Sequence, residues 1–329
     1  MKINAIYIAK CIGILLIVAE HTITLRQPDY YSNPFITMVK AFSMPAFMVL
    51  SGFVISNKPL DDKWINSKVK TNFLILTTTA ILYYAWYKLL PQYSMLQIET
   101  PLTLLEYMAY NFFSGFSILV TWYLYVMLIC YIILSGLWQM SDRWKWINIS
   151  SLVVLSIVLI NILPLFALGF GLVKWYGTFM LLGYLIGTHR DKLRKYLWLS
   201  YVGIPAFFIF GIMTNWMVNW QDLSYGRGGY TNIMQAIING RGVLLIVMVL
   251  AVILGCLALI GIARALEHIK MIQKPILYIG INVLWIYLLH PLFVGVFNNT
   301  IISVIFSVLC SITICEFVKL PINLSQVRV

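Results

Sequence analysis

The sequence contains few charged residues, and very few of them are negative. Only 10% of its 329 residues are Asp, Glu, Lys or Arg, with 11 acidic side chains against 23 basic ones. Soluble proteins carry about 25% charged residues. Mean hydropathy is +0.88, and apolar runs follow one another along nearly the whole chain. These values exclude a soluble globular domain and predict an integral membrane protein.

The sequence also lacks closely spaced cysteine pairs. The five cysteines include no Cys-x-x-Cys pair, so they read as small core residues and predict neither a metal site nor a redox motif. No small-x-small cleavage site follows the first apolar run, which Lys10 interrupts, so a retained first span is expected. Internal repeats and flexible linkers are lacking. We expect one integral-membrane domain, residues 1–329, with no appended soluble domain.

The apolar runs predict an all-α, polytopic fold with about ten transmembrane helices. Segment 91–120 fits none of them clearly and could hold an interfacial helix. The predicted spans are 5–25, 35–56, 70–90, 121–139, 146–164, 168–187, 197–217, 233–262, 276–296 and 300–319.

The basic residues determine the predicted orientation. A net charge of +12 could indicate nucleic acid, but the lysines and arginines lie in short loops between spans, which membrane topology explains better. With a cytoplasmic amino terminus, the opposite loops hold only Arg26, Lys88 and Arg227. Both termini are therefore predicted to be cytoplasmic. The cytoplasmic loops then hold Lys2, Lys58, Lys63, Lys68, Lys70, Arg143, Lys145, Arg190, Lys192, Arg194, Lys195, Arg264, Lys270, Lys274, Lys319 and Arg328.

Two ionisable residues share one face of the first span. Lys10 and His21 are eleven positions apart, which places them on the same helix face about 16 Å from one another along the axis. Ionisable groups at membrane depth are costly and usually functional. Glu20, beside His21, can hold the imidazole or reach a neighbouring helix. Lys10 is expected in the inner half of the membrane and His21 in the outer half.

Further polar and aromatic residues are expected near an outer-half cavity with Lys10 beneath it. A hairpin between the first two spans places Ser51 level with Lys10, and Pro45 is expected to interrupt the second helix. His290 could equally be a packing residue, and tryptophan and tyrosine occur at membrane boundaries whatever the function. The supporting candidates are Lys40, Trp122, Tyr123, Arg241 and His290.

Four motifs, in order along the chain, resemble those of the integral-membrane acyltransferase family 3. Lys10 and His21 match a basic residue followed, after ten positions, by histidine, although arginine is commoner in the first place. The second-span pattern is Phe42–Phe53, the mid-chain aromatic pattern is Thr121–Leu124, and the glycine–tyrosine–histidine–proline segment is Ile279–Pro291.

The resemblance implies transfer of an acyl group, mainly acetyl, from cytoplasmic acetyl-CoA or a related acyl-CoA. The acceptor is a hydroxyl of a bacterial surface glycan, such as lipopolysaccharide, or of a lipid-linked sugar at the outer face. The implied location is the bacterial cytoplasmic (inner) membrane, with no permanently bound cofactor and no nucleic-acid partner.

A neutral imidazole suits the task of accepting the hydroxyl proton, so His21 is the expected general base, assisted by Glu20. Lys10 and Ser51 are expected to bind the donor. Direct transfer and an acyl-protein intermediate both remain open. A transporter or polysaccharide exporter is the alternative function, because buried charges in a polytopic protein fit it on physical grounds; the lack of matching broken helices in the two halves argues against it.

Overall fold

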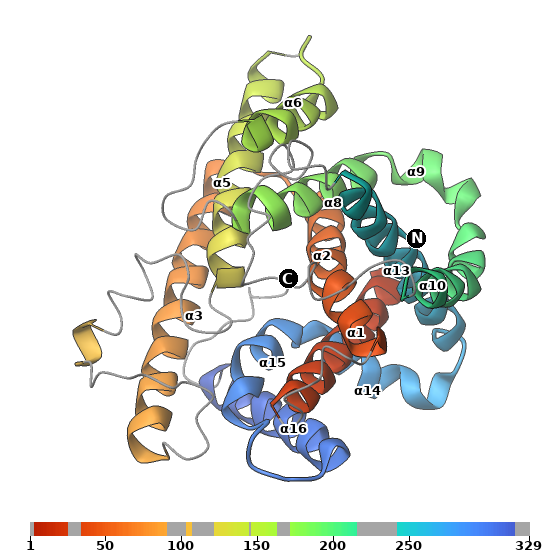
Figure 1. Ribbon diagram of the computed structural model, residues 1–329. Coiled ribbons are helices and arrows are strands. Elements are labelled where there is room, and N and C mark those ends of the chain that lie inside the picture. The colour runs from red at the N-terminus through yellow and green to blue at the C-terminus, as the bar shows by residue number, and fades with distance from the viewer. Residues whose placement is uncertain are drawn as a thin grey trace.

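The computed structural model describes residues 3–25, 34–90, 103–106, 122–144, 146–162, 172–215 and 242–319. Within these ranges the chain is helical and contains no β-strand, which confirms the all-α prediction (Figure 1). The elements are α1 (Ile3–Thr24), α2 (Pro34–Ile55), α3 (Asp62–Leu89), α5 (Trp122–Arg143), α6 (Ile149–Ile162), η3 (Val173–Gly177), α8 (Thr178–Thr188), α9 (Arg190–Leu193), η4 (Arg194–Tyr196), α10 (Leu199–Asn215), α13 (Gly242–Leu266), α14 (Lys270–Ile281), α15 (Val283–Leu289), η5 (His290–Leu292) and α16 (Thr300–Lys319).

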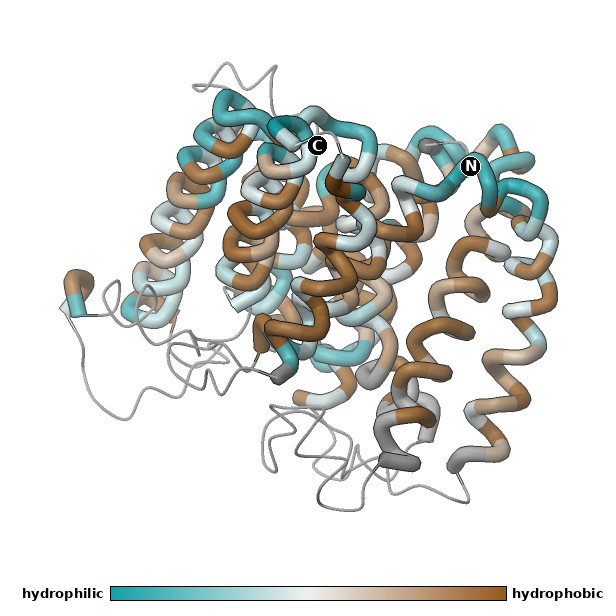
Figure 2. The backbone as a smooth tube through the Cα atoms, turned by 90° about the horizontal axis from the view of Figure 1, so that it is seen from above, coloured by the Kyte–Doolittle hydropathy of each residue, from teal (hydrophilic) through white to brown (hydrophobic). Residues whose placement is uncertain are grey.

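Several of these helices can cross a bilayer. In the described part of the chain, four are long and apolar enough, and up to six are if each of two bent pairs counts as one span. The hydrophilic residues gather at one end of the helices, where the chain begins, and apolar residues fill the length between (Figure 2). The chain is therefore a multi-pass membrane protein. Ten spans and two cytoplasmic termini remain predictions.

Helix α1 lies in the middle of the fold. It contacts α2 and α13 on one side and α14, α15 and α16 on the other (Figure 1). A Cβ on Gly280 of α14 would collide with the backbone carbonyl of Tyr7 in α1, so this close crossing requires glycine. The crossing places the N-terminal half of α1, including Lys10, directly against α14.

Helices α2 and α8 also pack with their backbones unusually close. A Cβ on Gly52 would overlap the carbonyl of Met180, and a Cβ on Gly183 would overlap that of Val49. Two glycines facing opposite backbones let the helices approach more closely than side chains normally allow, as is common between membrane helices. The contact holds Ser51, next to Gly52, in a set position.

The structure differs from the sequence-based boundaries at three places. Helix α2 continues through Pro45, so the expected interruption is not observed. Helix α3 begins at Asp62, earlier than predicted, because the Asp61 side chain caps it by accepting from the Trp64 N–H at 2.8 Å. The predicted span 276–296 is broken at Asn282 into α14 and α15, which together with η5 bend by 62°.

Within segment 91–120, only residues 103–106 are described. Thr103 and Glu106 form a capping box there: the Thr103 N–H bonds the Glu106 carboxylate at 2.7 Å, and the Glu106 N–H bonds the Thr103 hydroxyl at 3.3 Å. A helical turn therefore begins at Leu104, as the sequence allowed. Its relation to the membrane interface stays a prediction.

Candidate active site

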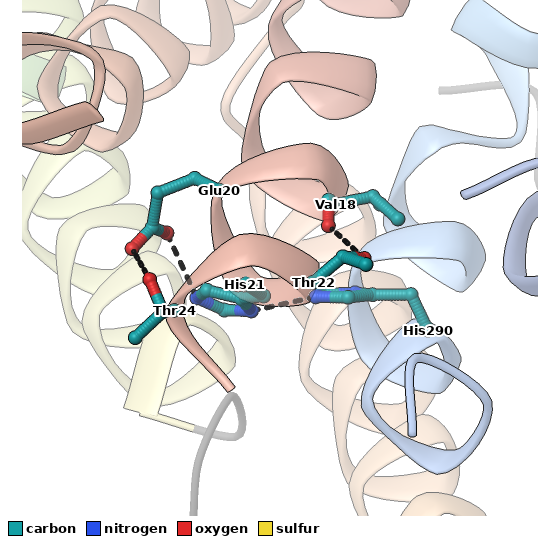
Figure 3. A network of polar contacts seen from close by, with 6 residues as sticks. All are labelled: Val18, Glu20, His21, Thr22, Thr24 and His290. Carbon is teal, nitrogen blue, oxygen red and sulfur yellow. Dashed lines mark hydrogen bonds and ion pairs between the residues drawn. The ribbon is translucent and has the colours of Figure 1, made fainter. Parts of the chain in front are cut away.

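Two histidines far apart in the sequence meet near the end of α1. His21 lies in the last turn of α1, and His290 follows the last residue of α15. Pro291 has no N–H to continue the α-helical pattern, and the chain tightens into η5 at this point. The His21 Nδ1 and His290 Nε2 atoms are 2.8 Å apart, and the two rings stack with centroids 5.0 Å apart (Figure 3).

Each histidine has a further polar partner. The His290 Nδ1 lies 3.0 Å from the carbonyl oxygen of Ile286, one turn earlier. The His21 Nε2 lies 3.4 Å from Glu20 Oε2, and the Thr24 hydroxyl donates to Glu20 Oε1 at 3.0 Å (Figure 3). A continuous polar chain therefore runs from the Ile286 carbonyl through both imidazoles to the Glu20 carboxylate.

The donors and acceptors in this series of hydrogen bonds can be assigned from their chemistry. The Ile286 carbonyl can only accept, so the His290 Nδ1 must carry a hydrogen. In a neutral His290 the Nε2 is then the acceptor, and the His21 Nδ1 must donate to it. This leaves the His21 Nε2 as the nitrogen that can take up a proton. A protonated His21 would place that new N–H beside the Glu20 carboxylate.

His21 is more exposed to its surroundings than either His290 or Glu20. His290 is fully buried and Glu20 is 6% exposed, whereas the His21 side chain keeps 25% of its surface exposed. The supporting groups are therefore shielded while the proton-accepting imidazole remains accessible. This arrangement suits a base that must meet a substrate.

Aromatic rings surround the dyad. The Tyr287 ring lies 6.0 Å from that of His290 and 4.9 Å from that of Tyr123. The Trp122 ring packs 4.5 Å from that of Tyr176, and Glu20 is close enough to Tyr176 and Tyr287 to interact electrostatically. Tyr176 belongs to η3, a π-helical segment of the kind that often marks functional sites.

A second polar site lies deeper, around Lys10. A cavity of about 60 Å³ is lined by Lys10, Lys68, Asn72, Ser51 and Tyr123, among others. Lys10 is only 4% exposed, and within the described residues its ammonium has no hydrogen-bond or ion-pair partner. Lys68 is near enough for the two positive charges to repel. Two cations sharing a small cavity form a site for an anion.

Asn72 and the Ser51–Tyr123 pair complete the lining of the Lys10 cavity. The Asn72 side chain is 5% exposed, and its Nδ2 has no hydrogen-bond partner among the described residues. The Ser51 and Tyr123 hydroxyls bond each other at 3.2 Å. Because that bond uses one of their two hydrogens, one O–H remains for a ligand. The cavity therefore offers both cations and neutral donors.

The structure describes the side chains of all the expected site residues except Lys40 and Arg241. It brings Lys10, Ser51 and Tyr123 to one cavity, and Glu20, His21 and His290 to another cluster. Arg241 lies outside the described residues, and for Lys40 only the position in α2 is described. His21 does not line the Lys10 cavity.

Tyr123 links the two clusters, because it lines the Lys10 cavity and its ring faces Tyr287, which in turn faces His290. Trp122 lies beside it, 6.3 Å between ring centroids, on the edge of the aromatic surroundings of the dyad. Tyr123 therefore connects the Lys10 cavity with the aromatic surroundings of the histidines, which the membrane-boundary explanation alone does not predict.

Sequence reasoning did not select three residues that the structure places in these clusters, Lys68, Asn72 and Tyr287, nor the buried Lys174 of η3. The sequence signal for Asn72 and Lys68 is a polar residue near the start of an apolar run. For Lys174 the signal is a cation inside a predicted span. Lys174 is 1% exposed within η3. Tyr287, three positions before His290, lies on the same helical turn as the histidine. That spacing is the signal that would have found it.

Comparison with known proteins identifies the family. A family model described as an acyltransferase domain matches residues 3–319, nearly the whole chain. The chain therefore belongs to the integral-membrane acyltransferase family 3. No curated protein and no solved structure matches it.

Proposed function

We propose that the protein transfers an acetyl group from cytoplasmic acetyl-CoA to a hydroxyl of a bacterial cell-surface glycan or lipid-linked sugar, acting in the inner membrane. Acyltransferase activity in general follows from the family. The observation that carries the finer proposal is the polar chain from Ile286 through His290 and His21 to Glu20. It provides one accessible proton acceptor, the His21 Nε2. The His290 ring orients the His21 imidazole, and the Glu20 carboxylate lies beside this nitrogen.

In the proposed reaction, the acceptor hydroxyl gives its proton to the His21 Nε2, and its oxygen attacks the thioester carbonyl carbon. The tetrahedral intermediate collapses with cleavage of the C–S bond, and the His21 imidazolium gives its proton to the released thiolate of CoA, which returns His21 to its neutral form. The products are an O-acetyl ester and CoA. Glu20 stabilises the imidazolium of His21 while it exists, because opposite charges 3.4 Å apart attract strongly away from bulk water.

The donor is proposed to enter the Lys10 cavity from the end of the bundle that carries most lysines and arginines. Lys10 and Lys68 supply positive charge for a phosphate group, and the Asn72 amide can donate to a carbonyl of the pantetheine arm. The remaining hydroxyl hydrogen of the Ser51–Tyr123 pair is available to a further polar atom of that arm. Aromatic faces at Trp122 and Tyr176 suit the apolar faces of a sugar ring.

The test is transfer by the purified protein in lipid vesicles. With acetyl-CoA labelled in the acetyl group and a crude glycolipid fraction as acceptor, we expect label in the glycolipid as a base-labile ester. Label that stays with CoA while glycolipid crosses the bilayer would contradict the proposal and favour an exporter. Label recovered in stable linkage to the protein, and later chased into glycolipid, would overturn direct transfer.

Replacing Lys10 should weaken the use of the donor specifically. Hydrogen bonds to charged groups contribute about 1.5–3 kcal/mol, so we expect Lys10→Ala to raise the KM for acetyl-CoA by about 10- to 100-fold. Lys10→Arg keeps the positive charge, so its KM for acetyl-CoA should stay close to that of the wild type. The measurement is initial rate against acetyl-CoA concentration, with Lys63→Ala as the control because Lys63 is exposed on α3 and does not line the cavity. An unchanged KM in Lys10→Ala would remove Lys10 from the donor site.

A further inference from the structure

A second, larger cavity lies on the other side of helix α2. Its volume is about 420 Å³, and its walls come from α2, α8, α9, η4, α10 and α13. Val49 and Phe53 of α2 line it, whereas Ser51 of the same helix faces the Lys10 cavity. The two cavities are therefore separated by α2 and cannot form one donor channel.

The lining of this larger cavity is almost entirely apolar, so its occupant must be a hydrocarbon chain. Its polar members are Arg190, Tyr196 and Ser200, and the Ser200 hydroxyl already donates to the Leu197 carbonyl at 2.6 Å. Sugars and nucleotides would lose their hydrogen bonds with water here and gain almost none. A volume of 420 Å³ corresponds to about fourteen units of about 30 Å³, the share of a water molecule and also about that of a methylene group. Most of one fatty acyl chain fits.

The segment at the mouth of the cavity is strongly basic. Residues 190–195 include Arg190, Lys192, Arg194 and Lys195, and Asp191 is their only acidic neighbour in that run. All of these side chains are exposed. Arg190 itself lines the cavity, so positive charge reaches the point where the hydrocarbon lining begins. Basic pockets between helices on the cytoplasmic side of a membrane favour anionic lipid headgroups.

The geometry places this basic segment at headgroup level. The chain bends by 69° between Arg190–Tyr196, which comprises α9 and η4, and Leu199–Met213 of α10. Tyr196 and Trp198 lie at the bend and are exposed, as is typical of side chains anchored in the membrane interface. A sharp bend with exposed aromatic residues is typical of a segment that lies along the membrane surface, and Arg190 and Tyr196 place this one at the edge of the apolar cavity.

We propose that this cavity binds one acyl chain of an anionic phospholipid from the cytoplasmic leaflet, with the phosphate headgroup held by the Arg190–Lys195 segment. Such a lipid would fill the space behind α2 and support the close α2–α8 contact from the cytoplasmic side. The site is independent of acetyl transfer, so it can be tested without any assay of activity.

Native mass spectrometry of the full chain, released from detergent containing equal amounts of phosphatidylglycerol and phosphatidylcholine, tests the proposal. We expect one retained phosphatidylglycerol and at least about a tenfold preference over phosphatidylcholine. Arg190→Gln combined with Arg194→Gln should abolish the preference. Lys63→Gln combined with Lys274→Gln makes the same charge change at exposed positions away from the cavity, and should leave the preference intact.

A pair of tryptophan variants separates cavity binding from surface attraction. Ile253→Trp places a large ring in the cavity from a half-exposed position, which should be tolerated by the fold and should prevent retention of the lipid. Ile246→Trp, two turns away on the same face of α13 and outside the cavity lining, should retain it. Equal retention of the two lipids by the wild type, or retention in Ile253→Trp equal to that in Ile246→Trp, would overturn the proposal. Displacement of the lipid by one equivalent of palmitoyl-CoA would also overturn it, because the cavity would then serve a long-chain donor.

Discussion

Acetyl transfer to glycolipid is expected to fall by about 10²- to 10⁴-fold in His21→Ala, the range that a positioned general base contributes. The acceptor hydroxyl is a poor nucleophile until its proton is removed, and the His21 Nε2 is the nitrogen that the hydrogen-bond chain leaves able to accept it. The measurement is single-turnover transfer in vesicles with the donor and acceptor saturating. Saturation makes the loss appear in the rate of the chemical step.

The control for this variant is His268→Ala, because His268 is an exposed histidine between α13 and α14 that belongs to neither polar cluster. It should transfer acetyl groups at the wild-type rate. Both variants should reach wild-type abundance in the membrane, since the His21 side chain is partly exposed. Transfer at the wild-type rate by His21→Ala would eliminate the imidazole as the base and with it the proposed mechanism.

Sequence alone predicted the parts of the site that lie within one helix. The eleven-residue spacing of Lys10 and His21 follows from helix geometry, and the structure places both residues in the same helix, α1. It also singled out Lys10 because ionisable groups at membrane depth are usually functional, and the structure shows this lysine to be buried. These conclusions need no knowledge of how helices pack.

The contact between His21 and His290 could not be derived in the same way. The two residues are 269 positions apart, and their meeting depends on the bend at Asn282 that turns α15 toward α1. Similar depth in the membrane made the contact possible, but depth does not choose a neighbour. The unpartnered Asn72 amide was hidden for a related reason: a polar residue in a span is informative only when its surroundings are known.

His290 is expected to act by positioning the His21 ring, without contacting the substrate, and replacing it should show this role. In His290→Met the His21 Nδ1 loses its acceptor, so the ring can rotate and place its hydrogen on either nitrogen. We expect kcat to fall by about 10²- to 10⁴-fold with little change in the KM for acetyl-CoA, by analogy with the loss of the orienting carboxylate in serine hydrolases. Methionine is apolar and flexible, and should fill most of the fully buried site.

His290→Gln is the matched variant that distinguishes positioning from packing. The glutamine Oε1 can reach the place of the imidazole Nε2 and accept from the His21 Nδ1, whereas methionine cannot replace that bond. Glutamine should therefore restore at least about tenfold of the rate lost in His290→Met, although it fits the aromatic surroundings of Tyr287 no better. If both variants lose the same rate, or if both lose membrane abundance in proportion to activity, His290 serves packing alone. If glutamine restores kcat, the second histidine directs the proton acceptor of the first.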